Sequence, residues 1–123
     1  MQHAANAYAK VFVETASPRA LEADLLLKAA AKLQNVHDAW DDQKKPAAFD
    51  EAVLYNRRLW TIFLDSVTQD DNKLPQPVRD NLTRLGVYIM AETFSLMTKP
   101  APAHLKKIIK VNRSLAAGLR GRA

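Results

Sequence analysis

Residues 52–67, read as A-V-L-Y-N-R-R-L-W-T-I-F-L-D-S-V, constrain the fold more than any other stretch of this chain. Apolar residues and one asparagine recur there every three or four positions, a spacing that places them on one face of an α-helix. The residues of this face are Val53, Asn56, Trp60, Phe63 and Val67, flanked by Leu59, Ile62 and Leu64. Because so little of the helix is left for water, we expect a central helix around which the other helices pack.

Four polar residues interrupt the apolar run: Asn56, Arg57, Arg58 and Thr61. A buried amide or guanidinium without a partner is costly. We therefore expect these four side chains to have partners elsewhere in the fold.

The same three-or-four spacing of apolar residues recurs along the rest of the chain, interrupted by breaks rich in proline, aspartate and lysine. It predicts helices over residues 2–14, 18–40, 47–69, 75–98 and 103–119. The 123 residues should therefore form a single all-α domain, a bundle of four longer helices plus a short N-terminal helix. Gly86 sits inside the helix predicted for 75–98, where it indicates close packing against another helix or, alternatively, a hinge.

Composition indicates a cytoplasmic protein. The sequence contains no cysteine, which fits a reducing compartment. Its N-terminus, M-Q-H-A-A-N-A-Y-A-K, lacks the basic start and apolar core of a signal peptide, and no apolar run is long enough to span a membrane. We expect no membrane insertion.

No pattern of catalytic or metal-binding residues emerges. The sequence has no phosphate-binding glycine loop and no nucleophile elbow. The histidines, His3, His37 and His104, fall in different elements, and His37 with Asp41 could supply only two of the four ligands of a structural zinc site. We therefore expect a protein that is not an enzyme and that has no cofactor and no metal.

Positive charge is concentrated at the C-terminal end. Residues 99–123 carry seven basic and no acidic residues, whereas the rest of the chain has 11 basic and 13 acidic residues. Lys106, Lys110 and Arg113 are spaced four and three apart, which predicts a basic amphipathic helix. This helix has three interpretations: a solvated face, a surface for an acidic partner, or a surface for RNA.

Three runs of the sequence resemble a known family: N-R-R-L-W-T-I-F at 56–63, E-T-F-S-L-M at 92–97 and V-N-R-S-L-A-A-G-L at 111–119. They are similar to the bacterial flagellar biosynthesis regulator FlaF, and the similarity runs through nearly the whole chain. The resemblance implies association with flagellin and a role in coupling flagellin synthesis to export. Its runs contain no catalytic signature.

We hypothesise from this resemblance that the protein cradles an amphipathic helical segment of unassembled flagellin against an apolar strip. The expected contacts are apolar or neutral residues near chain or helix ends: Tyr8, Phe12, Phe94, Met97, Ile109, Asn112 and Leu115. The alternative hypothesis is a post-transcriptional regulator that binds flagellin mRNA directly or acts through a second protein such as FlbT. Its contacts, which would also suit an acidic partner, are Lys106, Lys107, Lys110, Arg113, Arg120 and Arg122.

Overall fold

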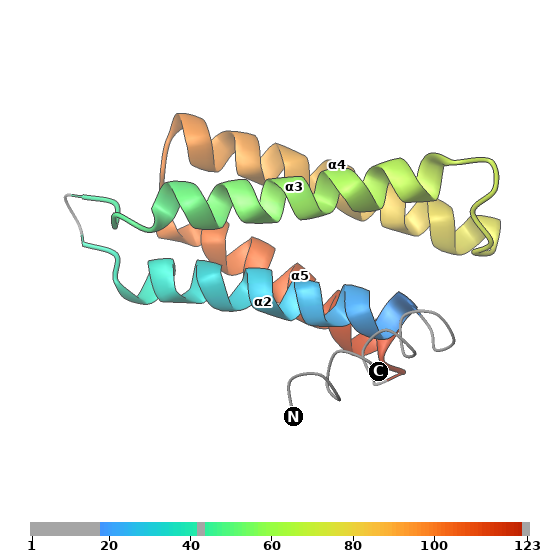
Figure 1. Cartoon of the computed structure of the whole chain (residues 1–123). Coiled ribbons are helices and arrows are strands. Elements are labelled where there is room, and N and C mark those ends of the chain that lie inside the picture. Colours follow the sequence, from blue (N-terminus) through green and yellow to red (C-terminus); the bar gives the residue numbers. More distant parts are fainter. Residues whose placement is uncertain (1–17, 42–43, 122–123) are drawn as a thin grey trace, which may run out of the picture.

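Four helices make up the part of the chain that the computed structural model describes, residues 18–41 and 44–121 (Figure 1). They are α2 (Pro18–Asp38), α3 (Phe49–Thr68), α4 (Gln76–Thr98) and α5 (Pro102–Leu119). Each boundary lies within two residues of the predicted one, and the all-α bundle is confirmed. The helix predicted for residues 2–14 lies outside the described residues.

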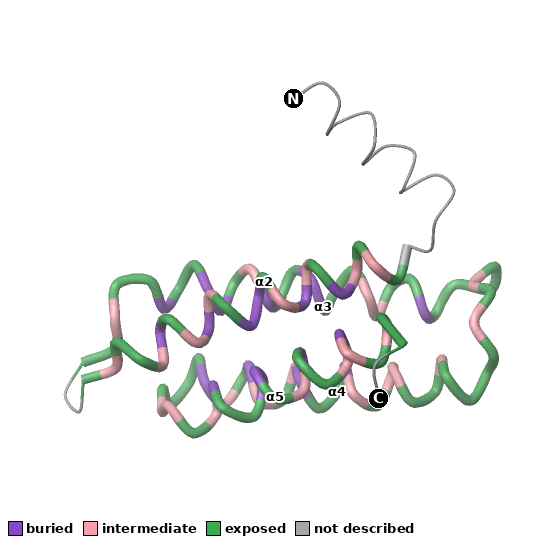
Figure 2. Tube along the Cα trace, turned by 90° about the horizontal axis from the view of Figure 1, so that it is seen from below, coloured by how far each residue is buried: buried purple, intermediate pink, exposed green. Residues whose placement is uncertain are grey.

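The helices pack as two pairs. α2 and α5 share the most extensive contact, α3 and α4 form the other pair, and α2–α3 and α4–α5 contacts join the pairs into a bundle. Successive helices run in opposite directions, and their buried residues face the interior (Figure 2). None of these four helices combines the length and apolarity that a membrane span requires.

One face of α3 is buried as the spacing predicts. Val53, Trp60 and Val67 are buried, and Phe63 is half-buried. The opposite face is exposed, however, and 62% of Ile62 is accessible to solvent. The expectation of a central helix surrounded by the others is therefore wrong, because α3 lies at one corner of the bundle between α2 and α4.

The polar residues of α3 differ in their surroundings. Arg57 and Arg58 are exposed and have no need of a buried partner, and the Thr61 hydroxyl donates a hydrogen bond to the Arg57 carbonyl at 2.8 Å. Only Asn56 is buried. The expectation of partners for all four was therefore wrong for the two arginines, since they lie on the outer face.

A buried hydrogen-bond network links α3 to α5. The Trp60 indole Nε1–H donates to Asn112 Oδ1 at 3.0 Å, and Asn112 Nδ2 donates to Asn56 Oδ1 at 2.7 Å. Asn56 Nδ2 has no hydrogen-bond partner among the described residues. The network joins two of the family-like runs of sequence, which therefore meet inside the core.

Gly86 lies where α4 packs closely against α3. A Cβ atom at this position would lie 2.3 Å from Leu64 Cδ2, far inside van der Waals contact. Any larger residue here would force the Leu64 side chain to move, so glycine lets α4 pack closely against α3 without that shift. The close-packing interpretation of Gly86 is confirmed.

Two residues of the second half of the chain hold the end of α3. Arg79 of α4 donates from Nε to the Val67 carbonyl at 2.9 Å and from Nη2 to the Gln69 carbonyl at 2.8 Å. Asn72 donates from Nδ2 to the Ser66 carbonyl at 3.0 Å. These bonds satisfy carbonyls at a helix C-terminus and fix the α3–α4 connection.

Candidate functional site

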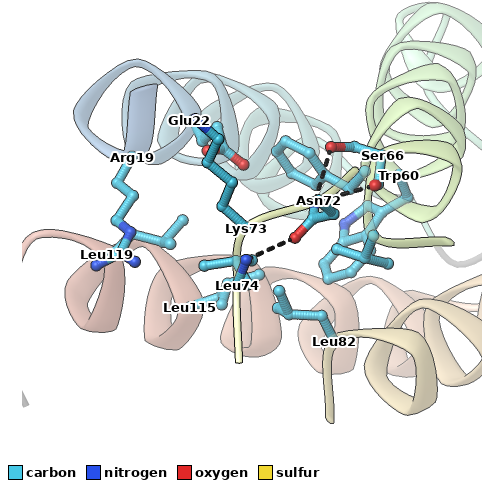
Figure 3. Close-up of a pocket in the computed structure, with 12 residues that line it drawn as sticks. Arg19, Glu22, Trp60, Ser66, Asn72, Lys73, Leu74, Leu82, Leu115 and Leu119 are labelled. Atoms are coloured by element: carbon cyan, nitrogen blue, oxygen red, sulfur yellow. Dashed lines mark hydrogen bonds between the residues drawn. The ribbon is translucent and has the colours of Figure 1, made fainter. Parts of the chain in front are cut away.

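An apolar cleft opens where α2 begins and where α3 and α5 end. Its volume is about 350 Å³. The connection between α3 and α4 passes along one side of it (Figure 3). We call it the end cleft; its lining residues are Arg19, Glu22, Trp60, Phe63, Ser66, Val67, Asn72, Lys73, Leu74, Leu82, Leu115 and Leu119.

The floor of the end cleft is aromatic and held by contacts within the core. Trp60 is buried, and its indole is fixed by the hydrogen bond to Asn112. Phe63 packs edge-on against Trp60, with ring centroids 5.7 Å apart and an angle of 84° between the planes. Leu115 and Leu119 of α5 approach from the opposite side and are only half-buried, so apolar surface is available to a ligand.

Polar groups form the rim of the end cleft. Burial raises the pKa of the Glu22 carboxyl above its ordinary value, and the charge of Arg19 opposes this shift. Asn72 Oδ1 accepts a hydrogen bond from the Leu74 backbone N–H at 2.9 Å, which holds Leu74 in the wall. An apolar interior with a few polar groups at its edge is typical of a site that binds one side of an amphipathic segment.

A second apolar surface lies on the outer face of α4. Val87, Phe94 and Met97 are all exposed, with 69% of Phe94 accessible to solvent. We call this surface the α4 strip. Phe94 and Met97 lie near the C-terminus of α4, whereas Leu82, which lines the end cleft, lies near its N-terminus, so the two surfaces are separate.

The structure does not bring the predicted flagellin contacts together. Phe94 and Met97 are exposed as expected, and Leu115 lines the end cleft. Ile109 is only 4% exposed and Asn112 is completely buried, so choosing them as surface contacts was wrong. Both lie on the part of α5 that packs into the core. Two further predicted contacts lie outside the described residues: Tyr8 and Phe12.

Two of the predicted basic contacts already have partners in the fold. Lys107 Nζ lies 3.4 Å from a carboxylate oxygen of Glu92, and Arg120 forms an ion pair with Asp24. The Glu92 carboxylate also lies 2.6 Å from His104 Nδ1. This hydrogen bond and, to a lesser extent, the nearby Lys107 hold the pKa of Glu92 below its ordinary value.

The other predicted basic contacts lie at a second cleft, of about 330 Å³, between α2 and α5. We call it the basic cleft; it is lined by Gln34, His37, Lys106, Ile109, Lys110, Arg113 and Ser114. The structure therefore gathers three of the predicted cations at one place. Arg122 lies outside the described residues.

Sequence reasoning missed most of the end cleft. Leu74 carried one usable signal, since it is an apolar residue inside an otherwise polar break between helices. Leu82 and Leu119 carried none, because each continues the apolar spacing of its own helix. Only the packing of the helices shows that these leucines remain partly uncovered at the end of the bundle.

Comparison with protein families gives one match. The family model described as "Flagellar protein FlaF" matches residues 4–119, which is nearly the whole chain. Neither the search of curated proteins nor that of solved structures gave a match.

Proposed function

Since this chain belongs to the FlaF family of flagellar proteins, we propose that it binds unassembled flagellin in the cytoplasm and couples flagellin synthesis to export. The end cleft is the observation that most supports this proposal. It offers apolar surface that the bundle itself leaves uncovered, next to an aromatic floor formed by Trp60 and Phe63.

The size of the end cleft limits what enters it. Its volume of about 350 Å³ is at the lower end of the range of roughly 300–1,000 Å³ for ligand pockets. It therefore accepts one or two apolar side chains of a partner rather than a whole helix. An amphipathic helix of flagellin would insert these side chains and rest its polar residues on the rim.

Binding of unassembled flagellin would keep its apolar surfaces from associating before export. Helical segments that assemble into a filament carry apolar faces, and these faces associate prematurely if they are exposed before export. Burying a single leucine or phenylalanine side chain contributes about 1.5–3 kcal/mol, while association itself costs several kcal/mol, so one or two anchors need further contacts on the rim and give only a reversible complex. A reversible complex can release its cargo to the export apparatus.

The test compares the two apolar surfaces in titration calorimetry with monomeric flagellin. Leu119→Glu places a charge in the end cleft and should weaken binding by about 10- to 100-fold. The matched variant Phe94→Glu places the same charge on the α4 strip and should leave affinity within about twofold. Circular dichroism of both variants checks that the helices are retained.

Two results would change the conclusion. If Phe94→Glu abolishes binding and Leu119→Glu does not, the α4 strip is the flagellin surface. If unmodified protein and monomeric flagellin do not associate at low or high salt, the flagellin-binding proposal is refuted. A negative heat-capacity change on binding would support burial of apolar surface.

The alternative function is regulation of flagellin mRNA, directly or together with FlbT. Two observations weaken direct RNA binding: Lys107 and Arg120 already pair with carboxylates of the fold. A flagellin message fragment, used as a competing titrant, tests this alternative. Phosphate binding should weaken steeply as salt rises, whereas binding in an apolar cleft should be much less sensitive.

A further inference from the structure

The basic cleft concentrates positive charge that the stability of α5 does not require. Lys110 lies four residues after Lys106 and three residues before Arg113, spacings at which like charges destabilise a helix. Within residues 18–41 and 44–121, no carboxylate lies within ion-pair distance of these three side chains.

The opposite wall of the basic cleft does not neutralise this charge. Gln34 and His37 of α2 line it, and both interact with the neighbouring Asp38. Gln34 Nε2 donates to Asp38 Oδ1 at 2.8 Å, and His37 Nδ1 lies 3.3 Å from the same oxygen. Asp38 is attracted to Arg113 over a longer distance, but its carboxylate is already hydrogen-bonded within α2.

We propose that the basic cleft binds an acidic segment of a partner protein, whose aspartate or glutamate carboxylates pair with Lys106, Lys110 and Arg113. This site is separate from the end cleft and does not depend on flagellin binding there. Arg113 can receive a carboxylate through two parallel hydrogen bonds, and the two lysines act as flexible point charges. Ile109 also lines the cleft, but only 4% of it is exposed, so the binding of the segment depends on the three cations.

The dimensions of the basic cleft suit a short acidic segment. The first cation and the last are seven positions apart on α5, a distance of about 10.5 Å along the helix axis. Alternate side chains of an extended peptide are about 6.6 Å apart, so two carboxylates fall within the span of the cations. The cleft volume of about 330 Å³ admits such side chains.

The lining of the basic cleft favours a peptide over RNA. Recognition of single-stranded RNA relies on aromatic side chains on which bases stack. No phenylalanine, tyrosine or tryptophan is among the described residues that line the cleft, and its one imidazole, that of His37, lies 3.3 Å from the Asp38 carboxylate. Positive charge with so little stacking surface suits carboxylates held on a protein chain.

The experiment is a fluorescence anisotropy titration of the full-length protein at low salt. The probes are a labelled peptide of alternating glutamate and serine, the same peptide with glutamine in place of glutamate, and a single-stranded RNA of equal charge. The cleft variant is Lys106→Gln/Lys110→Gln/Arg113→Gln. The control variant removes three exposed cations elsewhere, Arg57→Gln/Arg84→Gln/Lys99→Gln, so both variants have the same net charge.

We expect the glutamate peptide to bind, with an affinity about tenfold lower in the cleft variant and changed less than about twofold in the control. The glutamine peptide should not bind. Equal losses in both variants would reduce the effect to general attraction by a basic protein and overturn the proposal. Two other results would also overturn the proposal. One is preferential binding of the RNA that is lost in the cleft variant, which would make this a nucleic-acid site. The other is no binding of the glutamate peptide at all.

Discussion

Replacing Asn112 by alanine should destabilise the protein several times more than replacing Asn56 by alanine, although both side chains are buried. The difference arises from their positions in the network. Asn112 accepts from Trp60 and donates to Asn56, whereas Asn56 accepts one bond and leaves its own Nδ2 group without a partner among the described residues.

The magnitudes follow from the groups that each substitution leaves unpaired. Asn112→Ala leaves the Trp60 N–H and the Asn56 carbonyl oxygen buried without partners, at about 1–3 kcal/mol each, or roughly 2–6 kcal/mol together. Asn56→Ala leaves one donor of Asn112 unpaired but removes an amide group that was itself unpaired. These two effects nearly cancel, and lost packing of about 1 kcal/mol remains.

The assay is urea unfolding followed by far-ultraviolet circular dichroism. Tryptophan fluorescence is unsuitable, because both substitutions change the surroundings of Trp60. If the slope of unfolding free energy against urea is unchanged, Asn112→Ala should lower the midpoint by about 0.5–3 M relative to Asn56→Ala. Asn81→Ala, which removes an exposed amide from α4, is the control and should change stability by less than about 0.5 kcal/mol. Equal destabilisation by the two buried substitutions would refute the reasoning.

Three further predictions concern single side chains. Gly86→Ala should lower the free energy of unfolding by about 1–2 kcal/mol, because the new methyl group meets Leu64. Adding Leu64→Ala should relieve the clash, so that the higher helix propensity of alanine at position 86 can be measured. Arg79→Met should cost about 1–2 kcal/mol and speed hydrogen exchange in the last turn of α3, since the guanidinium bonds two carbonyls there. The pKa of Glu92 is lowered in the fold, chiefly by the hydrogen bond with His104, so its contribution to stability is complete above its ordinary value of 4.5 and is lost as the pH falls through the lower folded value. Urea midpoints measured from neutral pH downward should therefore depend less on pH in Glu92→Gln. Each prediction has a result that would contradict it. A Gly86→Ala protein as stable as the parent would contradict the clash with Leu64, and unchanged hydrogen exchange in Arg79→Met would contradict the bonds from Arg79 to α3. An unchanged acid dependence in Glu92→Gln would contradict the contribution of Glu92.

The helices were predictable because their signals are local. The three-or-four spacing and the proline positions depend on neighbouring residues, so the boundaries of α2 to α5 followed to within two residues. The tight packing at Gly86 followed for the same reason, since glycine inside a helix needs an explanation. What was not local was the position of each helix in the bundle.

Which side of an apolar helix is buried depends on where the helix lies in the bundle. Ile62 and Leu59 look equivalent in the sequence, yet only Leu59 is buried, because α3 has neighbours on one side. On α5, Ile109 and Asn112 looked available to a partner but lie in the core. Periodicity identifies an apolar face; it does not show how much of that face another helix will cover.

The charged residues show the same limit. The spacing of Lys106, Lys110 and Arg113 was evident, but nothing in it showed that Gln34 and His37 would form an opposite wall. The pairing of Lys107 with Glu92 joins residues that are 15 positions apart. Partners of this kind are set by how α4 and α5 dock, which a single sequence does not reveal.

The extensive contact between α2 and α5 affects the order of events during synthesis. The two helices are separated in the chain by all of α3 and α4, so α2 emerges from the ribosome well before its main packing partner. Closing so long a loop slows folding, and the apolar face of α2 stays uncovered until then. The end cleft includes residues of both helices, so it forms only when α5 has docked. A nascent chain that has not yet released α5 therefore has no end cleft with which to capture a partner.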